Sequence, residues 1–350
     1  MAAASGPAKI GRRWHYLGMI RPGRALVSVL ASLALALAAG ERELEACDST
    51  GCLMVTRSAG GLLPRKAFRL DFSYRSTDDS VMLSGSDSTS LVIRPKIDFE
   101  DQIVKPGFHQ DLGGTSRFLQ LDLAYGLTGH TTLVASAPIF SQRSYEVGHL
   151  FVLTENYKTT GIGDTLVAVR HALVADPSFS LVASAGLELP TGDYRLVAST
   201  GLYDVGILDP MLQPGSGSWD VLLSAQGTKR LTTGGLDMTG AFSYQINTTN
   251  PLDYSFGDDA IASLGASFPF GSRVRGSLQA KWAHRGRSAY KGEGVSSTGG
   301  DVLYAIPGLS VTATSRMSVY LYMLVPTYRY VNETQLAPRL SVVVGIGRTF

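Results

Sequence analysis

The chain has 350 residues, of which 44% are hydrophobic, 17% are charged and 39 are glycine, and its mean hydropathy is +0.09. The formal net charge is +2, but residues 1–39 contain five of the 31 basic residues and no acidic residue, so the rest of the chain has 26 basic against 29 acidic residues, a net charge of −3. A nucleic-acid partner is therefore not expected, because no basic excess remains beyond residue 39. No apolar run of about 18 residues follows residue 39, which excludes a bundle of membrane-spanning helices.

The N-terminal segment predicts export. An apolar run over residues 25–39 ends in small side chains. It follows a group of basic residues, of which Arg21 and Arg24 are the last. This order is typical of a secretory signal peptide, which we place at residues 1–39. Met19 is an alternative start of translation. A membrane anchor helix is the other interpretation, but a span needs about 20 apolar residues and the run is shorter.

Residues 40–66 are expected to form a short periplasmic segment, which contains both cysteines of the chain, Cys47 and Cys52. A disulfide between them is the favoured interpretation, because the periplasm is oxidising. Free thiols and a metal or redox role are the alternatives. Two thiols without a nearby histidine do not complete a metal-binding set, so neither a metal nor another cofactor is expected.

From residue 67 onwards, apolar side chains recur at every second position, which predicts β-strands rather than helices. In the first run, Phe68, Leu70 and Phe72 alternate with Arg69 and Asp71. Similar runs are 119–125, 179–189, 219–225, 236–244, 274–282 and 317–325. Each is close to the length of about 9 to 11 residues that a tilted strand needs to cross a bilayer.

The connections between these runs alternate between short and long. Short turns are expected at 126–130, 174–177, 227–234, 269–272 and 312–315, and long polar loops at 141–160, 190–216, 247–258, 285–300 and 327–338. Bacterial outer-membrane barrels place their short turns in the periplasm and their long loops outside the cell. The sequence therefore predicts an all-β fold in which residues 67–350 form a single transmembrane antiparallel β-barrel domain.

Counting the runs predicts twelve strands, with fourteen as the alternative. The run that decides the count is 91–99, which also alternates but contains Pro95. Because proline cannot donate to a ladder of backbone hydrogen bonds, we interpret this run as part of a long first external loop over residues 75–115. A twelve-stranded barrel encloses a narrow lumen, larger than that of an eight-stranded barrel and smaller than that of a porin.

The last strand is predicted over residues 340–350, where apolar residues alternate with small or polar ones and the chain ends in Phe350. This ending resembles the signal that barrel-assembly machinery recognises, although Arg348 stands where that pattern has an apolar or aromatic residue. A soluble protein that ends in a strand is the alternative. Together with the export segment, the pattern predicts a protein of the bacterial outer membrane whose partners are outer-membrane lipid and the assembly machinery.

Side chains opposite the apolar rows are expected to face the lumen. Charged residues at membrane depth are tolerated only where they face water or one another. The charged residues that meet this condition are Asp122, Asp164, Arg170, Glu188, Asp220, Arg275 and Lys281. One hypothesis is that they form a polar constriction that selects small-molecule solutes. The other is that they form ion pairs that hold the walls of a closed barrel together.

Four phrases of the sequence, over residues 125–128, 161–164, 186–194 and 215–220, resemble an outer-membrane transporter-like family named after the phenol meta-cleavage pathway. The phrase at 186–194, Gly-Leu-Glu-Leu-Pro-Thr-Gly-Asp-Tyr, is the most specific, and the resemblance extends over roughly residues 68–350. It implies a barrel that admits small, often apolar, organic compounds. The long first loop and the cysteine segment depart from the family pattern.

Enzymatic activity is not expected. His171 is predicted to face outward whereas Ser180 and Ser184 are predicted to face inward, so a base and a nucleophile would lie on opposite faces of the wall. Two functions remain. One is a channel or transporter for small organic solutes, and the other is a closed structural or surface-binding barrel whose long loops bind a partner.

Overall fold

The computed structural model describes residues 62–149, 153–197 and 206–350. The predicted signal peptide and the two cysteines, Cys47 and Cys52, lie outside the described residues. The described part of the chain has no helix whose length and apolarity would let it span a bilayer. Its architecture is all-β, as the alternating runs predict.

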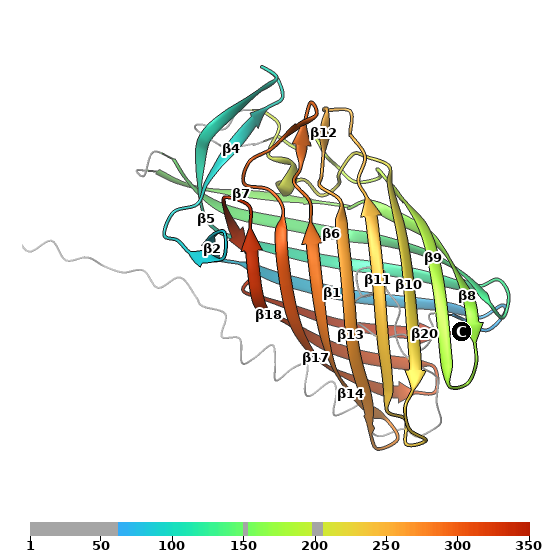
Figure 1. Cartoon of the computed structure of the whole chain (residues 1–350). Helices are drawn as coiled ribbons and strands as arrows, with labels where there is room; N and C mark the ends of the chain where they lie inside the picture. Colours follow the sequence, from blue (N-terminus) through green and yellow to red (C-terminus); the bar gives the residue numbers. More distant parts are fainter. Residues whose placement is uncertain (1–61, 150–152, 198–205) are drawn as a thin grey trace, which may run out of the picture. The chain divides into compact units, whose positions relative to one another are not determined.

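Twelve antiparallel strands close into a barrel (Figure 1), so the predicted fold and strand count are confirmed. In chain order they are β1 (Phe68–Asp79), β5 (Ile103–Gly126), β6 (Thr131–His149), β8 (Thr165–Ala175), β9 (Phe179–Leu189), β10 (Asp220–Arg230), β11 (Asp237–Ile246), β13 (Asp259–Phe270), β14 (Val274–Arg285), β17 (Gly300–Thr314), β18 (Met317–Val331) and β20 (Leu340–Thr349). The barrel closes because β1 pairs with β20 on one side and with β5 on the other. Each remaining strand of the twelve pairs with a neighbour on both sides, which leaves the barrel without a free edge.

The two faces of the wall differ in polarity. Along β1, Arg69, Asp71 and Ser73 are buried on the inner face, whereas Phe72 and Tyr74 are exposed on the outer face. The outer face of the other strands exposes large apolar side chains, among them Val169, Phe242, Leu264, Leu278, Met323 and Ile346. A wall with apolar groups outside and polar groups inside suits lipid on one side and water on the other.

Short turns lie at one end of the barrel, which we call the short-turn end. They span residues 127–130, 176–178, 231–236, 271–273 and 315–316. The turn expected at 227–234 is displaced, because β10 continues to Arg230 and pairs with β11 throughout. Gly271 has a φ of 79°, a conformation that residues with a Cβ rarely adopt.

The chain ends at the short-turn end, beside the start of β1. Phe350 N donates to Phe68 O at 2.7 Å, and the two rings lie 6.2 Å apart. The guanidinium carbon of Arg348 lies 4.8 Å from the centre of the Phe350 ring. Arg348, the exception to the apolar pattern, thus makes a cation–π contact with the terminal aromatic residue.

At the opposite end of the barrel, which we call the long-loop end, two segments that were expected to be loops contain strands. Residues 75–115 are not a loop, because β1 runs to Asp79, β4 (Ile93–Asp98) forms a strand and β5 begins at Ile103. Residues 141–160 are also paired, since β6 continues to His149 and forms a hairpin with β7 (Leu153–Gly161). β4 takes the place of β1 beside β5, and β7 takes the place of β8 beside β6. The four strands therefore extend the wall beyond the barrel (Figure 1).

Pro95 lies in β4, contrary to the expectation that it would exclude a strand. β4 pairs with β5 alone among the described strands, and the register shifts between Arg94 and Lys96. Proline is compatible with an edge strand at such an irregularity, because no donor is needed there. The run 91–99 is thus partly a strand, but it stands outside the barrel and does not change the count of twelve.

Two small sheets and a short helix complete the long-loop end. We call these elements, together with the four strands of the extended wall, the cap. One sheet contains β2 (Val81–Ser84), β3 (Asp87–Ser88) and β19 (Thr334–Ala337), and the other contains β12 (Tyr254–Ser255), β15 (Ala289–Tyr290) and β16 (Glu293–Gly294). The 3-10 helix η1 spans Pro210–Leu212. The expected loop at 327–338 is thus also partly paired, because β18 reaches Val331 and β19 follows. Buried clusters hold the cap, such as Ile97 with Tyr254, Tyr290 and Val295.

Candidate functional site

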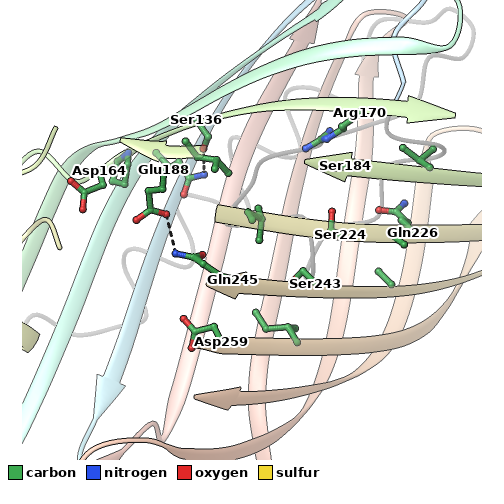
Figure 2. A pocket seen from close by; sticks show the side chains of 18 of the residues that line it. Ser136, Asp164, Arg170, Ser184, Glu188, Ser224, Gln226, Ser243, Gln245 and Asp259 are labelled. Atoms are coloured by element: carbon green, nitrogen blue, oxygen red, sulfur yellow. Dashed lines mark hydrogen bonds between the residues drawn. The ribbon is translucent and has the colours of Figure 1, made fainter. Parts of the chain in front are cut away.

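A cavity of about 280 Å³ lies on the inner face of the barrel (Figure 2). One side is formed by β8, β9, β10, β11 and β13. The other side carries Arg75 from β1, Gln120 from β5, and Ser136 and Pro138 from β6. The cavity is lined by a mixture of charged, amide, hydroxyl and aliphatic side chains, so it can take a small solute that has both polar and apolar parts.

A polar row crosses four neighbouring strands in this cavity. Arg170 is opposite Ser184, Ser184 is opposite Ser224, and Ser224 is opposite Ser243 in the register of the sheet. Residues in register point to the same face, with their Cβ atoms about 5 Å apart. Arg170 is 1% exposed, and a guanidinium stays charged even when buried. The row therefore presents one fixed positive charge beside three hydroxyl groups.

Carboxylates lie at the other end of the cavity, towards the long-loop end. Glu188 Oε2 accepts a hydrogen bond from Gln245 Nε2 at 3.3 Å. Asp259 is held by both nitrogens of a guanidinium fork, with Arg285 Nε at 2.7 Å and Nη2 at 2.8 Å. Figure 2 shows Glu188, Asp164 and Asp259 together, apart from Arg170. The carboxylates of the cavity are thus gathered towards the long-loop end, where the Arg285 guanidinium is paired with one of them.

Asp164 also accepts hydrogen bonds from the long connection between β9 and β10. Its Oδ1 accepts from Gly192 N at 2.8 Å, and its Oδ2 accepts from Ser216 N at 2.5 Å and Ser216 Oγ at 2.8 Å. A Cβ on Gly192 would lie 2.7 Å from the Ile162 carbonyl oxygen, so only glycine fits this close approach. Three of the phrases that carry the family resemblance, 161–164, 186–194 and 215–220, therefore meet at this point, which we call the loop base.

Asp220 belongs to the same loop base and does not line the cavity. It is 1% exposed, and it accepts from Ser218 Oγ at 3.0 Å and from Thr248 N at 2.8 Å. Asp122 is held in a similar way on β5, where it accepts from Gln120 Nε2 at 2.9 Å and from Ser136 Oγ. These two carboxylates orient neighbouring groups, and Gln120 and Ser136 in turn line the cavity.

The two remaining predicted residues lie elsewhere. Arg275 is near the short-turn end, where its Nη1 lies 3.2 Å from both Asp237 Oδ2 and Ser267 Oγ. Lys281 Nζ lies 5.8 Å from the centre of the Tyr304 ring. Of the seven residues proposed from the sequence, the structure brings Asp164, Arg170 and Glu188 together around the cavity and distributes the other four over other contacts.

The family model described as "Putative MetA-pathway of phenol degradation" matches residues 94–330, which run from β4 to the end of β18. The chain belongs to this family. The matched region contains the loop base and most of the cavity lining, so the resemblance noted in the sequence is confirmed. Among curated proteins, none matches the sequence.

The fold of this family member resembles that of a solved outer-membrane channel. The COG4313 outer membrane channel from Pseudomonas putida F1 superimposes with a TM-score of 0.57 at 15% identity, over 85% of this chain and 100% of that chain. KdgM porin in complex with disordered oligogalacturonate has a TM-score of 0.41 at 8% identity, over 81% and 99%. The TodX deltaS2S3 mutant monoaromatic hydrocarbon channel has a TM-score of 0.41 at 11% identity, over 82% and 91%.

Sequence patterns missed several residues that line the cavity of this family member, and Arg75 is the most informative. Its guanidinium carbon lies 4.9 Å from the centre of the Phe118 ring, and that of Arg143 lies 5.6 Å from the same ring. The sequence pattern predicts that the first strand ends at Tyr74, which places Arg75 in a loop. The alternation in fact continues to Asp79 within β1, and following it further would have placed Arg75 on the inner face. Gln120, Ser136 and Gln245 also line the cavity but are uncharged, and Asp259, a further lining residue, lies outside the alternating runs of the sequence.

Arg143 links the cavity to the cap. Its Nη1 donates to the carbonyl oxygen of Met211, and Thr159 Oγ1 donates to that of Leu212. Leu212 also packs against Tyr145 in a buried cluster on the inner side of the extended wall. The helix η1 is therefore held against β6 and β7.

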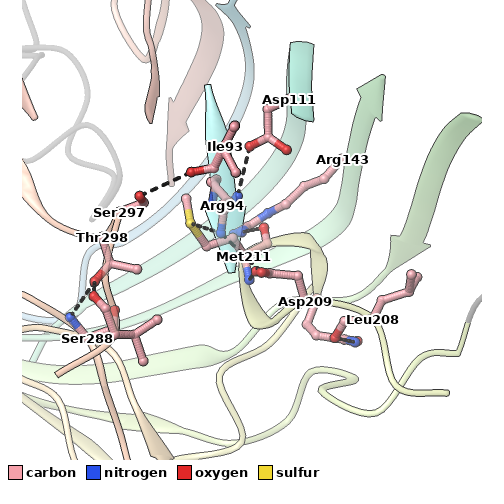
Figure 3. A network of polar contacts seen from close by, with 12 residues as sticks. Ile93, Arg94, Asp111, Arg143, Leu208, Asp209, Met211, Ser288, Ser297 and Thr298 are labelled. Atoms are coloured by element: carbon pink, nitrogen blue, oxygen red, sulfur yellow. Dashed lines mark hydrogen bonds and ion pairs between the residues drawn. The ribbon is translucent and has the colours of Figure 1, made fainter. Parts of the chain in front are cut away.

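A buried arginine fastens the same helix from the other side (Figure 3). Arg94 Nη1 lies 3.2 Å from Asp111 Oδ2, and its Nη2 lies 3.1 Å from Asp209 Oδ2. Asp209 is the N-cap of η1 and accepts from Met211 N at 2.8 Å. Burial raises the pKa of Asp111, and the Arg94 charge opposes that rise. Removing Arg94 would leave a buried carboxylate without its cation.

The described residues contain no group of three or more histidine, cysteine, aspartate and glutamate residues arranged to hold a metal ion. His171 lies on the outer face of the wall, with its Nδ1 3.0 Å from Thr131 Oγ1. Ser184 lines the cavity on the inner face. This placement does not bring His171 and Ser184 together as a base and a nucleophile.

Proposed function

We propose that this protein is a channel of the bacterial outer membrane for small organic solutes, apolar compounds included. The observation that carries the proposal is a cavity of about 280 Å³ inside a closed barrel whose outer surface is apolar. The fold is that of outer-membrane channels, as the COG4313 superposition indicates. The membership in the phenol-degradation family favours aromatic or other small organic solutes.

The proposed orientation follows from the two ends of the barrel. The short-turn end, where the chain also ends, faces the periplasm, and the cap faces outward, because bacterial barrels keep long connections outside. Residues 1–39 act as a signal peptide in this proposal, and Cys47 and Cys52 form a disulfide after export. Phe350, which is exposed, is available to the assembly machinery.

Conductance of the purified full-length protein in a planar bilayer tests the channel proposal. We expect discrete current steps that are absent from a detergent control and from heat-unfolded protein. Silence from protein that is folded, judged by its heat-modifiable mobility in gels, contradicts an open pore. Solute flux into liposomes then decides whether uncharged compounds cross without ions.

A second candidate function is a closed barrel whose cap binds a partner. The observation that favours it is the folded character of the cap, which exposes Ile103 and Val104 near the turn between β4 and β5. A protein that shows neither conductance nor solute flux, but binds to cells or surface polymers through its cap, would support this function over the channel.

A further inference from the structure

The outer face of the wall changes from apolar to polar where β5 and β6 pass from the barrel into the cap. On β5, Leu121 and Leu119 lie on this face, and Arg117 is the next outward residue. In the register of the sheet, Leu119 is opposite Tyr74 on one side and Phe140 on the other, so an apolar row crosses three strands just before the change. The surface that suits lipid chains therefore ends immediately beside Arg117.

The neighbours of Arg117 and of Lys158, on β7, show that both side chains point outward. Phe118 lies on the inner side, where its ring is 4.9 Å from the guanidinium carbon of Arg75. Thr159 is 3% exposed and donates to a carbonyl oxygen of helix η1 on the inner side. Because consecutive side chains of a strand point to opposite faces, Arg117 and Lys158 lie on the outer face, and both are exposed.

Uncharged polar residues fill the surface between these two cations. Gln142 is opposite Arg117, and Ser144 is opposite Lys158, so β6 separates the two basic residues. Strands lie about 4.8 Å apart and rise about 3.3 Å per residue, which places the two Cα atoms roughly 12 Å apart. We call Arg117, Gln142, Ser144 and Lys158 the polar band. It presents two cations, an amide and a hydroxyl group within the width of one lipid headgroup.

Carboxylates lie around the polar band but not between its two cations. Asp78 forms an ion pair with Arg339 at 3.8 Å. Glu146 lies one row farther from the barrel than Lys158. Within the part of the chain that the structure describes, neither Arg117 nor Lys158 belongs to an ion pair. Their charges are therefore available to an anion outside the wall.

The opposite sector of the wall has a different polar boundary. On β14, Trp282 Nε1 donates to Asp301 Oδ1 at 3.0 Å. On β11, Tyr244 Oη donates to Asp258 Oδ2 at 2.8 Å. These contacts join aromatic and acidic groups, whereas the boundary on β5 to β7 is cationic. An anionic headgroup would thus be bound on one side of the barrel only.

The residue types of the polar band match a phosphorylated sugar. The planar guanidinium of Arg117 suits a phosphate group, and the ammonium of Lys158 adds a second positive charge. The amide and hydroxyl groups between them can exchange hydrogen bonds with sugar hydroxyls. Lipid chains attached to the same sugar would cover the apolar row beside the band. A headgroup with two phosphates would engage both cations.

We propose that the polar band binds the phosphorylated glycolipid of the outer leaflet, with its phosphates on Arg117 and Lys158 and its acyl chains along the leucine residues of β5. This inference goes beyond solute passage and depends on the proposed orientation, in which the cap faces outward. Gln142 and Ser144 are then contacts of the sugar.

Native mass spectrometry of the full-length protein in detergent, titrated with bisphosphorylated lipid A, tests the proposal. We expect lipid A to bind about ten times more tightly than the same lipid without its phosphates. Arg117→Gln and Lys158→Gln should each weaken lipid A binding about three- to fivefold, as loss of an exposed ion contact does, and leave the dephosphorylated lipid unaffected.

The matched control is Lys229→Gln, which removes an exposed cation from the outer face at the short-turn end and should change neither affinity. Equal binding of the two lipid forms, or variants of the polar band that bind as the control does, would overturn the site. Phosphatidylglycerol binding as tightly as lipid A would overturn the glycolipid assignment. Bilayer conductance is a separate measurement: if the folded protein is silent but binds lipid A as expected, the channel proposal fails and the lipid site stands.

Discussion

The wall of the barrel and the cap share strands, but different forces hold them. In the wall, each strand forms backbone ladders with both neighbours, and those of β14 with β13 and β17 run without interruption. In the cap, separate segments are joined by buried clusters and by ion pairs such as that of Arg94 with Asp209. The wall therefore depends on a repeated local pattern, whereas the cap depends on a few contacts between segments distant in sequence.

The largest expected effect concerns the cap alone. Arg94→Gln should destabilise the packing of η1 by about 3 to 5 kcal/mol, because it leaves the buried Asp111 without its cation. Limited proteolysis with mass mapping should then show cleavage near residues 206–219, while the barrel keeps its heat-modifiable mobility. Arg316→Gln, in an exposed turn at the other end, is the matched control. Unchanged cleavage in Arg94→Gln would contradict the role of this ion pair.

The loop base joins the wall to the cap, and a glycine there should be nearly as sensitive. Gly192→Ala places a Cβ within 2.7 Å of a backbone oxygen, and overpacking of this kind costs about 1 to 3 kcal/mol. We expect a lower midpoint of urea unfolding. Gly129→Ala provides the comparison, because a Cβ at Gly129 meets no atom within 4 Å. Equal midpoints for the two variants would show that the loop base accommodates the added methyl group without a loss of stability.

In the wall of the barrel, the buried hydroxyl group of Tyr320 forms a hydrogen bond with Asp71. Tyr320 Oη donates to Asp71 Oδ1 at 2.8 Å, and Tyr320 is 2% exposed. Tyr320→Phe should lower the free energy of unfolding by about 1 kcal/mol, the net contribution of a buried hydrogen bond. Tyr328→Phe, which changes an exposed residue on the same strand, should have little effect. The measurement is again the midpoint of urea unfolding, and the same loss in both variants would rule out the hydrogen bond as its cause.

The smallest effect should be a pH dependence confined to the cap. Hydrogen bonds from Arg287 hold the pKa of Glu333 below its usual value near 4.5. A lowered pKa in the folded state stabilises the cap above pH 4.5, and this contribution is lost as the pH falls further. Both side chains are more than a third exposed, so the change should stay below about 1 kcal/mol. Hydrogen exchange of residues 295–299, measured between pH 6 and 3.5, tests this pH dependence. In the Glu333→Gln variant, the additional loss of protection below pH 4.5 should disappear.

The quality of the sequence predictions follows the same division between wall and cap. In β20, Val342 and Val344 alternate with Ser341 and Val343 across the two faces, and the prediction of a last strand was correct because side-chain direction in a strand depends only on position. The cap was predicted as loops. In the sequence, Pro95 argues against a strand, but whether a strand lies at an edge depends on its neighbours, which one sequence does not reveal.

The candidate site shows the same limit at the level of single residues. Alternation predicts that Arg170 and Glu188 face inward, and both residues line the cavity. It also proposed Asp220, which serves the loop base, and Arg275, which lies in contact with Asp237 near the short-turn end. Alternation along a strand indicates which face of the wall a side chain occupies. It does not indicate the position of that side chain along the barrel axis or the residues that it contacts. Arg75 was missed because the end of a strand, unlike its centre, is set by pairing with distant residues.

The sequence alone predicts the all-β class of this protein and the polarity of the two faces of its wall, because a period of two residues is a local property that any stretch of strand must obey. The sequence pattern does not reveal which polar side chains share one cavity, how three separate phrases meet at the loop base, or that the long connections fold into a cap. Those features depend on register and on closure of the barrel, which bring together residues as distant as Arg75 and Asp259. Such contacts arise from the whole ring of strands and cannot be derived from any one of them.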